Sequence, residues 1–326
     1  MHLLPFIGLG IGLVLFSILL VWQGILEVLY LIISSGWVML LMPVIWLPSL
    51  LPTTEAWRVL FNGPNRPSFL PALSAIWMGR AINNLLPVAT IGGEVIKARL
   101  IILSGIAGTH ASASVLVDKT VQVLAVIVWG LIGVGLLLYL SIDNHLALIS
   151  LFGFIILTVA VVVFLIIQKA GLFNLLAKLG ARLIKSDAWD KLATNAQVVD
   201  QIVVETYQRK LQFIYSVFLK TLGLVLQTGE VWLACYLLGQ PVSIIEALML
   251  KSLTSALSDI AFIIPNAYGI QEGAYIVLGT LMGFTPDFSL AISLATRIRE
   301  LIVDIPGLVL WQYTEGRLWL RKQVTE

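Results

Sequence analysis

The chain has 326 residues, of which 59% are hydrophobic and only 12% are charged, and its mean hydropathy is +0.98. Soluble domains carry about a quarter charged residues, so this composition excludes a soluble globule and predicts a protein that spans a lipid bilayer. The formal net charge of +2 is too small and too scattered to indicate nucleic-acid binding. One cysteine and three histidines without metal-ligand spacing predict no disulfide framework, no metal site and no cofactor.

Ten apolar runs follow one another along the chain, and none alternates polar and apolar residues as the strands of a membrane β-barrel do. We therefore expect an all-α, polytopic integral membrane protein. The runs lie at about 3–22, 31–51, 70–87, 91–106, 113–140, 146–168, 211–238, 243–264, 268–284 and 288–313. The first run is long enough to cross a bilayer of about 30 Å and follows no basic residue, so we interpret it as a transmembrane helix rather than a signal peptide.

Lys and Arg are unevenly distributed among the loops, which predicts the orientation of the chain. Basic residues gather in 55–68, in 169–210 and in the C-terminal tail, which we expect to be cytoplasmic together with the N-terminus. The turns without Lys or Arg, expected on the other side, are 23–30, 141–145 and 239–243. This path leaves about six full transmembrane helices, while 70–106 and 243–284 each begin and end on one side as broken or re-entrant helical hairpins.

Two polar breaks interrupt these same-side segments, at 83–94 and 264–273. In each break a proline is followed by alanine two residues later and by glutamate seven residues later, with glycine between them. Proline and glycine end helices, and non-helical backbone at membrane depth needs protein or water around it. Because the loop charges place the breaks on opposite faces, we expect an inverted repeat with a polar site near the midplane. The single transmembrane domain 1–326 would comprise the halves 1–168 and 211–326 and a connector, 169–210.

Charged residues follow each break, in helices that are otherwise apolar. A charge at mid-bilayer costs about 2.5–3.5 kcal/mol on insertion scales, so Arg297 should be paired. Arg297 with Glu300, and Glu300 with Asp304, share a helix face at i,i+3 and i,i+4. We predict a lipid-headgroup cavity lined by Asn84, Pro87, Gly92, Gly93, Glu94, Asp118, Pro265, Asn266, Gly269, Gln271, Glu272, Arg297, Arg299 and Glu300. We assign no catalytic and no metal-binding residue.

Two roles are open for these groups. In a structural role, Glu94 and Glu272 pair with nearby basic residues and clamp the two halves together. In a functional role, the charges line a path for a lipid headgroup, or one carboxylate carries a coupling proton. The amides of the two breaks either bind polyol or amide groups of a substrate or cap the broken helix ends.

The connector 169–210 has two parts. Leucines at helical spacing with basic residues between them predict an interfacial amphipathic helix over 171–185, lying on anionic headgroups. Residues 186–210 continue as a polar connector, which is either a solvated linker or a docking surface for a lipid-biosynthesis protein.

The two breaks also resemble a known family. The run Asn84-Leu-Leu-Pro87-Val-Ala-Thr-Ile-Gly92-Gly93-Glu94-Val-Ile-Lys97-Ala-Arg99-Leu is similar to the first signature of the lysylphosphatidylglycerol synthase transmembrane, or flippase-like, superfamily. Pro265 through Glu272, followed by Arg297-Ile-Arg299-Glu300-Leu, resembles the second. Gly269-Ile-Gln271-Glu272-Gly273 and Pro306-Gly-Leu-Val-Leu-Trp311-Gln are most similar to hopanoid-associated membrane proteins of the HpnL type.

The resemblance implies a bacterial inner-membrane protein that flips or exports lipids, hopanoids or phospholipids, across the bilayer. Members that synthesise lysylphosphatidylglycerol carry a soluble aminoacyl-transferase domain after the membrane part. Few residues follow the last apolar run here, so we expect no enzyme activity. A non-catalytic partner of hopanoid or lipid-biosynthesis enzymes is the alternative, and a membrane-embedded lipid transferase is a third hypothesis that no nucleophile or metal motif supports.

Overall fold

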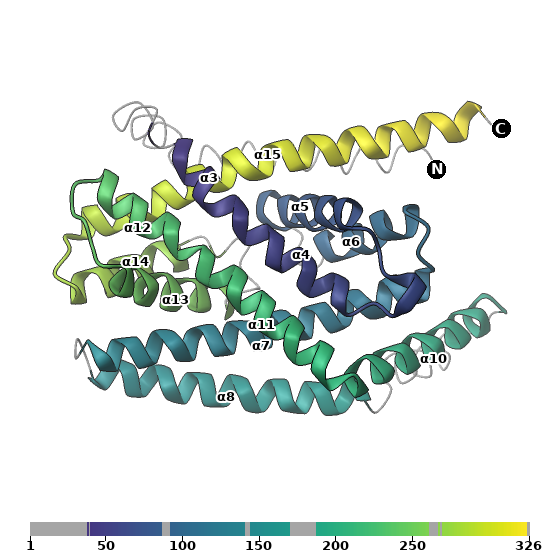
Figure 1. Ribbon diagram of the computed structural model, residues 1–326, viewed down its shortest axis with the longest axis horizontal. Coiled ribbons are helices and arrows are strands. Elements are labelled where there is room, and N and C mark those ends of the chain that lie inside the picture. The colour runs from purple at the N-terminus through teal and green to yellow at the C-terminus, as the bar shows by residue number, and fades with distance from the viewer. Residues whose placement is uncertain are drawn as a thin grey trace. The chain divides into compact units, whose positions relative to one another are not determined.

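The computed structural model describes residues 38, 40–86, 92–140, 144–169, 187–260, 267 and 269–324 (Figure 1). Every regular element in these ranges is helical, which confirms the predicted all-α class. Several predicted features lie outside the described residues, namely the helix 3–22, the turn 23–30, most of the turn 141–145, the amphipathic helix 171–185 and the break residues Pro87, Pro265 and Asn266.

Most of the described helices follow the predicted apolar runs, whereas α4 and α10 lie largely outside them. The described helices are α3 (Leu41–Trp46), α4 (Leu50–Val59), α5 (Phe69–Leu85), α6 (Gly92–Leu103), α7 (Gly108–Tyr139), α8 (Asn144–Lys169), α10 (Asp187–Gln208), α11 (Lys210–Leu226), α12 (Thr228–Leu237), α13 (Ile244–Ile260), α14 (Ile270–Leu281) and α15 (Pro286–Val324), with 3-10 turns at η2 (Leu47–Ser49) and η3 (Gly63–Asn65). Within these ranges, two stretches are long and apolar enough to cross a membrane, Gly108–Tyr139 and Lys210–Leu237. The larger number of full spans stays a prediction.

Helix lengths recur in the same order in the two parts of the chain. Helices α4, α5, α6 and α7 have 10, 17, 12 and 32 residues. Helices α12, α13, α14 and α15 have 10, 17, 12 and 39 residues. Each predicted break falls between the 17-residue and the 12-residue helix. This order agrees with a duplicated unit, whereas opposite insertion of the two copies stays a prediction.

The chain forms two compact units, and each takes segments from both predicted halves. Unit 1 comprises Met1–Leu47, Ile76–Ile96 and Gln227–Glu326, and unit 2 comprises Pro48–Ala75 and Lys97–Leu226. The boundaries cut through α5 and α6, and one falls between α11 and α12.

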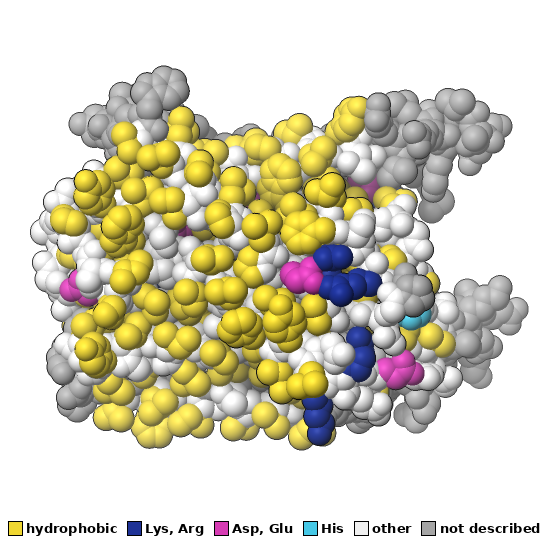
Figure 2. Space-filling model, viewed as in Figure 1, with side chains coloured by type: hydrophobic (Ala, Val, Ile, Leu, Met, Phe, Trp, Pro, Cys, Tyr) yellow, Lys and Arg dark blue, Asp and Glu magenta, His cyan; other side chains and the backbone are white. Residues whose placement is uncertain are grey.

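In unit 2, α11 packs on α4 and α7, and α8 packs on α7. The approach of α11 to α4 is close, because a Cβ at Gly223 would lie 2.6 Å from Thr53 Oγ1, and Ser216 Oγ donates a hydrogen bond to Ala56 O at 2.7 Å. Hydrophobic side chains cover most of the face that α4 and α11 form, and charged side chains gather where α4 ends and α11 begins (Figure 2). This distribution is typical of a membrane protein with a charged end near the headgroups.

Helix α10 differs from the predicted polar connector over 186–210. It is a regular helix that packs on α7 and α8 within unit 2 (Figure 1). Its buried face includes Ala196, Val199, Val203 and Tyr207. The interpretation as a solvated linker therefore fails over this stretch, because apolar residues at helical spacing among the polar ones give the helix a face to bury.

In unit 1, α14 packs on α13 and α15, and α12 packs on α3, α13 and α15. The part of α5 in this unit contacts α15 through a small core of Ala81, Ile82, Leu85 and Leu308. Trp77 Nε1 donates a hydrogen bond to the Val303 carbonyl of α15 at 2.8 Å. These contacts bring α5, which precedes the first predicted break, and α14, which follows the second, against one long helix, α15.

Candidate functional site

The first break ends in a tight crossing of α5 and α6 within unit 1. The Gly93 N–H donates a hydrogen bond to Asn83 Oδ1 at 2.8 Å. A Cβ at Gly93 would lie 2.0 Å from the Gly79 carbonyl oxygen, so only glycine fits there. Gly92 begins α6, and Glu94 lies in its first turn, partly buried. The glycine pair of the break therefore serves close helix packing.

The second break ends at Gly269, which adopts the left-handed φ of +81° before α14 begins. Glu272 Oε2 accepts a hydrogen bond from the Gly269 N–H at 2.7 Å and so caps the helix. Gln271 Nε2 donates to Ser293 Oγ at 3.3 Å and to Thr296 Oγ1 at 3.0 Å on α15. The residues after this break thus anchor α14 to α15.

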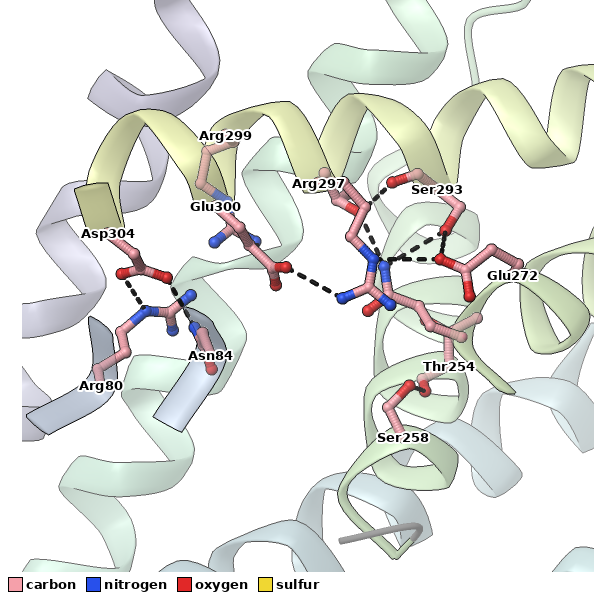
Figure 3. Close-up of polar contacts among 12 residues, drawn as sticks. Arg80, Asn84, Thr254, Ser258, Glu272, Ser293, Arg297, Arg299, Glu300 and Asp304 are labelled. Carbon is pink, nitrogen blue, oxygen red and sulfur yellow. Dashed lines mark hydrogen bonds and ion pairs between the residues drawn. The ribbon is translucent and has the colours of Figure 1, made fainter. Parts of the chain in front are cut away.

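Arg297 lies at the centre of the polar contacts between α14 and α15 (Figure 3). Its Nε is 3.1 Å from Glu272 Oε1 and its Nη1 is 3.1 Å from Glu300 Oε2. The Arg297 side chain is only 4% exposed, against 17% for Glu272 and 13% for Glu300. The predicted pairing of a deep Arg297 with Glu300 is therefore confirmed, and Glu272 shares the same guanidinium group.

Further ion pairs extend this contact into a chain of alternating charges. Arg299 Nη2 lies 3.7 Å from Glu300 Oε1. On its other side, Arg299 holds Glu230 of α12, and Lys251 Nζ of α13 lies 2.6 Å from Glu230 Oε1. Glu230 is fully buried. This charge chain ranges from the partly exposed carboxylates Glu272 and Glu300 to the fully buried Glu230. Its members are Glu272, Arg297, Glu300, Arg299, Glu230 and Lys251.

A second ion pair in unit 1 joins α5 to α15. Arg80 Nε lies 3.1 Å from Asp304 Oδ1, and Asn84 Nδ2 donates to Asp304 Oδ2 at 2.7 Å (Figure 3). The indole of Trp46 lies between two cations, with the guanidinium carbons of Arg80 and Arg299 4.1 Å and 4.7 Å from ring centroids. Trp46 therefore connects this ion pair to the chain of alternating charges.

Unit 2 holds its own buried ion cluster around Asp118 of α7. Lys97 Nζ lies 2.5 Å from Asp118 Oδ2, and Lys220 Nζ lies 2.9 Å from Asp118 Oδ1. Lys97 also stands over the ring of Trp57, with its Nζ 4.8 Å from the centroid. In both units, an acid is held between two cations, and one of those cations stacks on a tryptophan.

The structure brings together part of the predicted cavity lining. The predicted residues that meet in the polar cluster of unit 1 are Asn84, Gln271, Glu272, Arg297, Arg299 and Glu300. Asp118 belongs to the separate cluster of unit 2. Sequence reasoning left Glu230, Lys251, Lys220 and Trp46 out of the candidate site. Glu230, Lys251 and Lys220 are each an isolated charge inside an apolar run. The same pattern indicated Arg297, so it could have indicated these three residues as well.

The arrangement is suited to exchanging ionic partners. Removing one partner of a buried pair costs about 3–5 kcal/mol, whereas replacing a whole pair by apolar side chains is often neutral. Apolar side chains would therefore stabilise this interior as well as six linked charges do, so stability alone does not explain the charges. Glu272 and Glu300 are the partly exposed members of this chain, and a guanidinium group such as that of Arg297 binds carboxylate and phosphate alike.

Comparison with known proteins gives a consistent result. A family model described as the lysylphosphatidylglycerol synthase TM region matches residues 7–307. The UPF0104 membrane protein PH1989 of Pyrococcus horikoshii is 24% identical over 309 residues, which cover 88% of this chain and 90% of that protein. No solved structure matches the chain.

Proposed function

The chain belongs to the family of the lysylphosphatidylglycerol synthase transmembrane region, and on this premise we propose that it translocates lipids across the bacterial inner membrane. One observation carries the proposal: six alternating charges lie in contact inside unit 1 of a membrane protein, with an accessible end at Glu272 and Glu300. Charges inside transmembrane segments are rare and commonly mark the path of a polar substrate.

The proposed path begins at Arg297. A lipid phosphate replaces one of the two carboxylates on its guanidinium group, so the charge of the headgroup is never left unpaired in hydrocarbon. The displaced carboxylate, that of Glu272 or Glu300, stays partly hydrated because its side chain is partly exposed. This exchange lowers the barrier for the headgroup, because the desolvation cost of a lone ion is several kcal/mol.

The charges favour a lipid with an anionic headgroup as the substrate. For a hopanoid with a polyol headgroup, the amides of Asn84 and Gln271 are the better matched groups, and both already donate hydrogen bonds within the cluster. We propose translocation without catalysis, because the carboxylates of the chain are held in ion pairs rather than arranged as a nucleophile with its base.

The proposed orientation places both termini and the loop 60–65 on the cytoplasmic side. Arg209, at the end of α10, donates from Nη2 to the Leu60 carbonyl at 2.5 Å and from Nη1 to the Phe61 carbonyl at 3.3 Å. Two basic segments that the loop charges assign to one side therefore lie in contact, which supports the assignment of a shared side.

A liposome assay with matched variants tests the proposal. The full chain is reconstituted into vesicles that contain a fluorescent phospholipid or a fluorescent hopanoid, and translocation is followed by quenching of the outer leaflet. The test variant is Glu272→Gln, which keeps an oxygen acceptor for the Gly269 N–H but removes the charge beside Arg297. The control is Glu246→Gln, because Glu246 is a partly exposed carboxylate that caps α13 by accepting a hydrogen bond from the Ser243 N–H at 2.8 Å and lies outside the charge chain.

We expect the wild-type chain and Glu246→Gln to translocate one of the lipids and Glu272→Gln to lose most of that activity while keeping its thermal stability. Equal rates in all three proteins would reject the charge chain as the path. Loss of both activity and stability in Glu272→Gln alone would support the structural role of the ion pairs instead.

A further inference from the structure

A cavity of about 340 Å³ lies in unit 2, where the loop after α4 meets α7 and α10. Its size falls in the range of about 300–1,000 Å³ that is typical of small-molecule sites. Its lining includes Leu60, Phe61, His110, Glu205 and Arg209. None of these residues belongs to the candidate lipid path, so the cavity is a separate feature.

Two opposite charges line this cavity, the partly buried Arg209 and the exposed Glu205, and no ion pair within 4.0 Å joins them. Arg209 donates its hydrogen bonds to the Leu60 and Phe61 carbonyls, and Glu205 Oε1 accepts one from Gln201 Nε2 at 2.9 Å. Neither charge has an ion-pair partner within 4.0 Å in the part of the chain that the structure describes. Burial lowers the pKa of Arg209, and the nearby Glu205 carboxylate opposes that shift. The cavity thus offers one cation and one anion to a ligand.

His110 adds a further polar atom to the lining of the cavity. Its Nδ1 is buried and finds no hydrogen-bond partner among the described residues. His110 lies in the first turn of the 32-residue helix α7, and no side chain caps that end of the helix. The free N–H groups and the positive end of the helix dipole favour an anion at this position. An unsatisfied buried nitrogen in a polar cavity is a group that a ligand can complete.

We propose that this cavity binds a small zwitterion, whose oxyanion faces His110 and Arg209 and whose ammonium group faces Glu205. A phosphoethanolamine group has this chemistry, and it reaches the protein either as a lipid headgroup or as a soluble molecule. Glu205 favours the zwitterion over a simple anion, because a carboxylate beside a phosphate is repulsive. The inference concerns unit 2 alone and does not depend on lipid translocation.

Isothermal titration calorimetry on the full chain in lipid-free detergent micelles tests the site. The probes are glycerophosphoethanolamine, which carries both charges, glycerol 3-phosphate, which carries only the oxyanion, and ethanolamine, which carries only the ammonium group. We expect the zwitterion to bind roughly tenfold more tightly than either single-charge probe, because a hydrogen bond to a charged group contributes on that order.

Charge-removing variants assign the binding to this cavity. Glu205→Gln should weaken zwitterion binding roughly tenfold while leaving glycerol 3-phosphate binding unchanged or stronger. His110→Phe should weaken the binding of both of these probes, and the control Glu246→Gln, which does not line the cavity, should alter neither. Equal binding of the zwitterion to wild type and Glu205→Gln, or no preference for the zwitterion, would overturn the assignment.

Nanodiscs distinguish the two sources of the ligand. In discs of phosphatidylglycerol with phosphatidylethanolamine, competition against added glycerophosphoethanolamine supports a lipid headgroup as the occupant. If glycerophosphoethanolamine binds as tightly in those discs as in discs of phosphatidylglycerol alone, the result supports a soluble zwitterion as the occupant. Absence of binding in micelles and in both kinds of disc would overturn the site altogether.

Discussion

Arg299 holds Glu230 with two nitrogens, Nε at 2.5 Å from Oε2 and Nη2 at 3.1 Å from Oε1, although 69 residues separate them in the sequence. Both side chains are almost fully buried. The planar guanidinium fork matches a carboxylate in a way that a lysine ammonium group does not. This bidentate pair ties α15 to α12 in the interior of unit 1.

Replacement of Arg299 by lysine should therefore destabilise the protein although the charge is kept. We expect a loss of about 1–3 kcal/mol in the free energy of unfolding, because one charge-assisted hydrogen bond is lost in a dry site. Thermal unfolding in detergent measures the change. The matched control is Arg66→Lys, since Arg66 pairs with Glu55 at an exposed position and should change stability little. Equal effects of the two substitutions would contradict the geometry.

Asp118 should matter more than either of its lysine partners. Asp118→Asn removes the carboxylate that both ammonium groups contact, and we expect a loss of about 3–5 kcal/mol. Lys220→Met leaves Lys97 and Asp118 as a neutral pair, so its loss should be smaller. Chemical unfolding of the two variants in the same detergent measures the difference. A larger loss in Lys220→Met would mean that the lysines do not share the carboxylate.

Gly93 should tolerate no side chain. A Cβ there would lie 2.0 Å from the Gly79 carbonyl oxygen and 2.6 Å from Asn83 Cγ, so Gly93→Ala forces α6 away from α5. We expect a marked fall in folded yield and melting temperature, which size-exclusion chromatography and thermal scanning measure. Gly135→Ala in α7 is the control, because nothing lies within 4 Å of its Cβ. That change should be neutral or stabilise by up to about 1 kcal/mol through helix propensity.

Trp46 should stabilise the two guanidinium groups that face it. Trp46→Leu removes two cation–π contacts at a desolvated site, each of which contributes about 2 kcal/mol in such settings. Trp46→Phe keeps an aromatic face and should lower the melting temperature less. Trp232→Leu serves as a comparison, because Trp232 is 39% exposed and stacks only on Tyr236 among the described ring contacts. Equal melting temperatures of Trp46→Leu and Trp46→Phe would mean that the cation–π contacts contribute nothing to stability.

The sequence by itself determined the helical membrane class, the family, the positions of most helices and the depth of Arg297. Each follows from a local property, since a run of apolar residues can satisfy its backbone in lipid only as a helix, and a charge within such a run must find a partner. The i,i+3 pairing of Arg297 with Glu300 was accessible for the same reason, because both residues lie on one helix.

Only the tertiary structure decided which distant charges meet. Sequence spacing within one helix cannot reveal that Glu230 of α12 lies between Lys251 and Arg299, or that Asp118 joins Lys97 and Lys220 rather than the residues of the second break. The cavity at the end of α10 was likewise decided by packing, because its lining comes from the loop after α4, from α7 and from α10. Partners 20 to 230 residues apart are selected by how whole helices pack, and packing depends on the shape of every side chain at the contact.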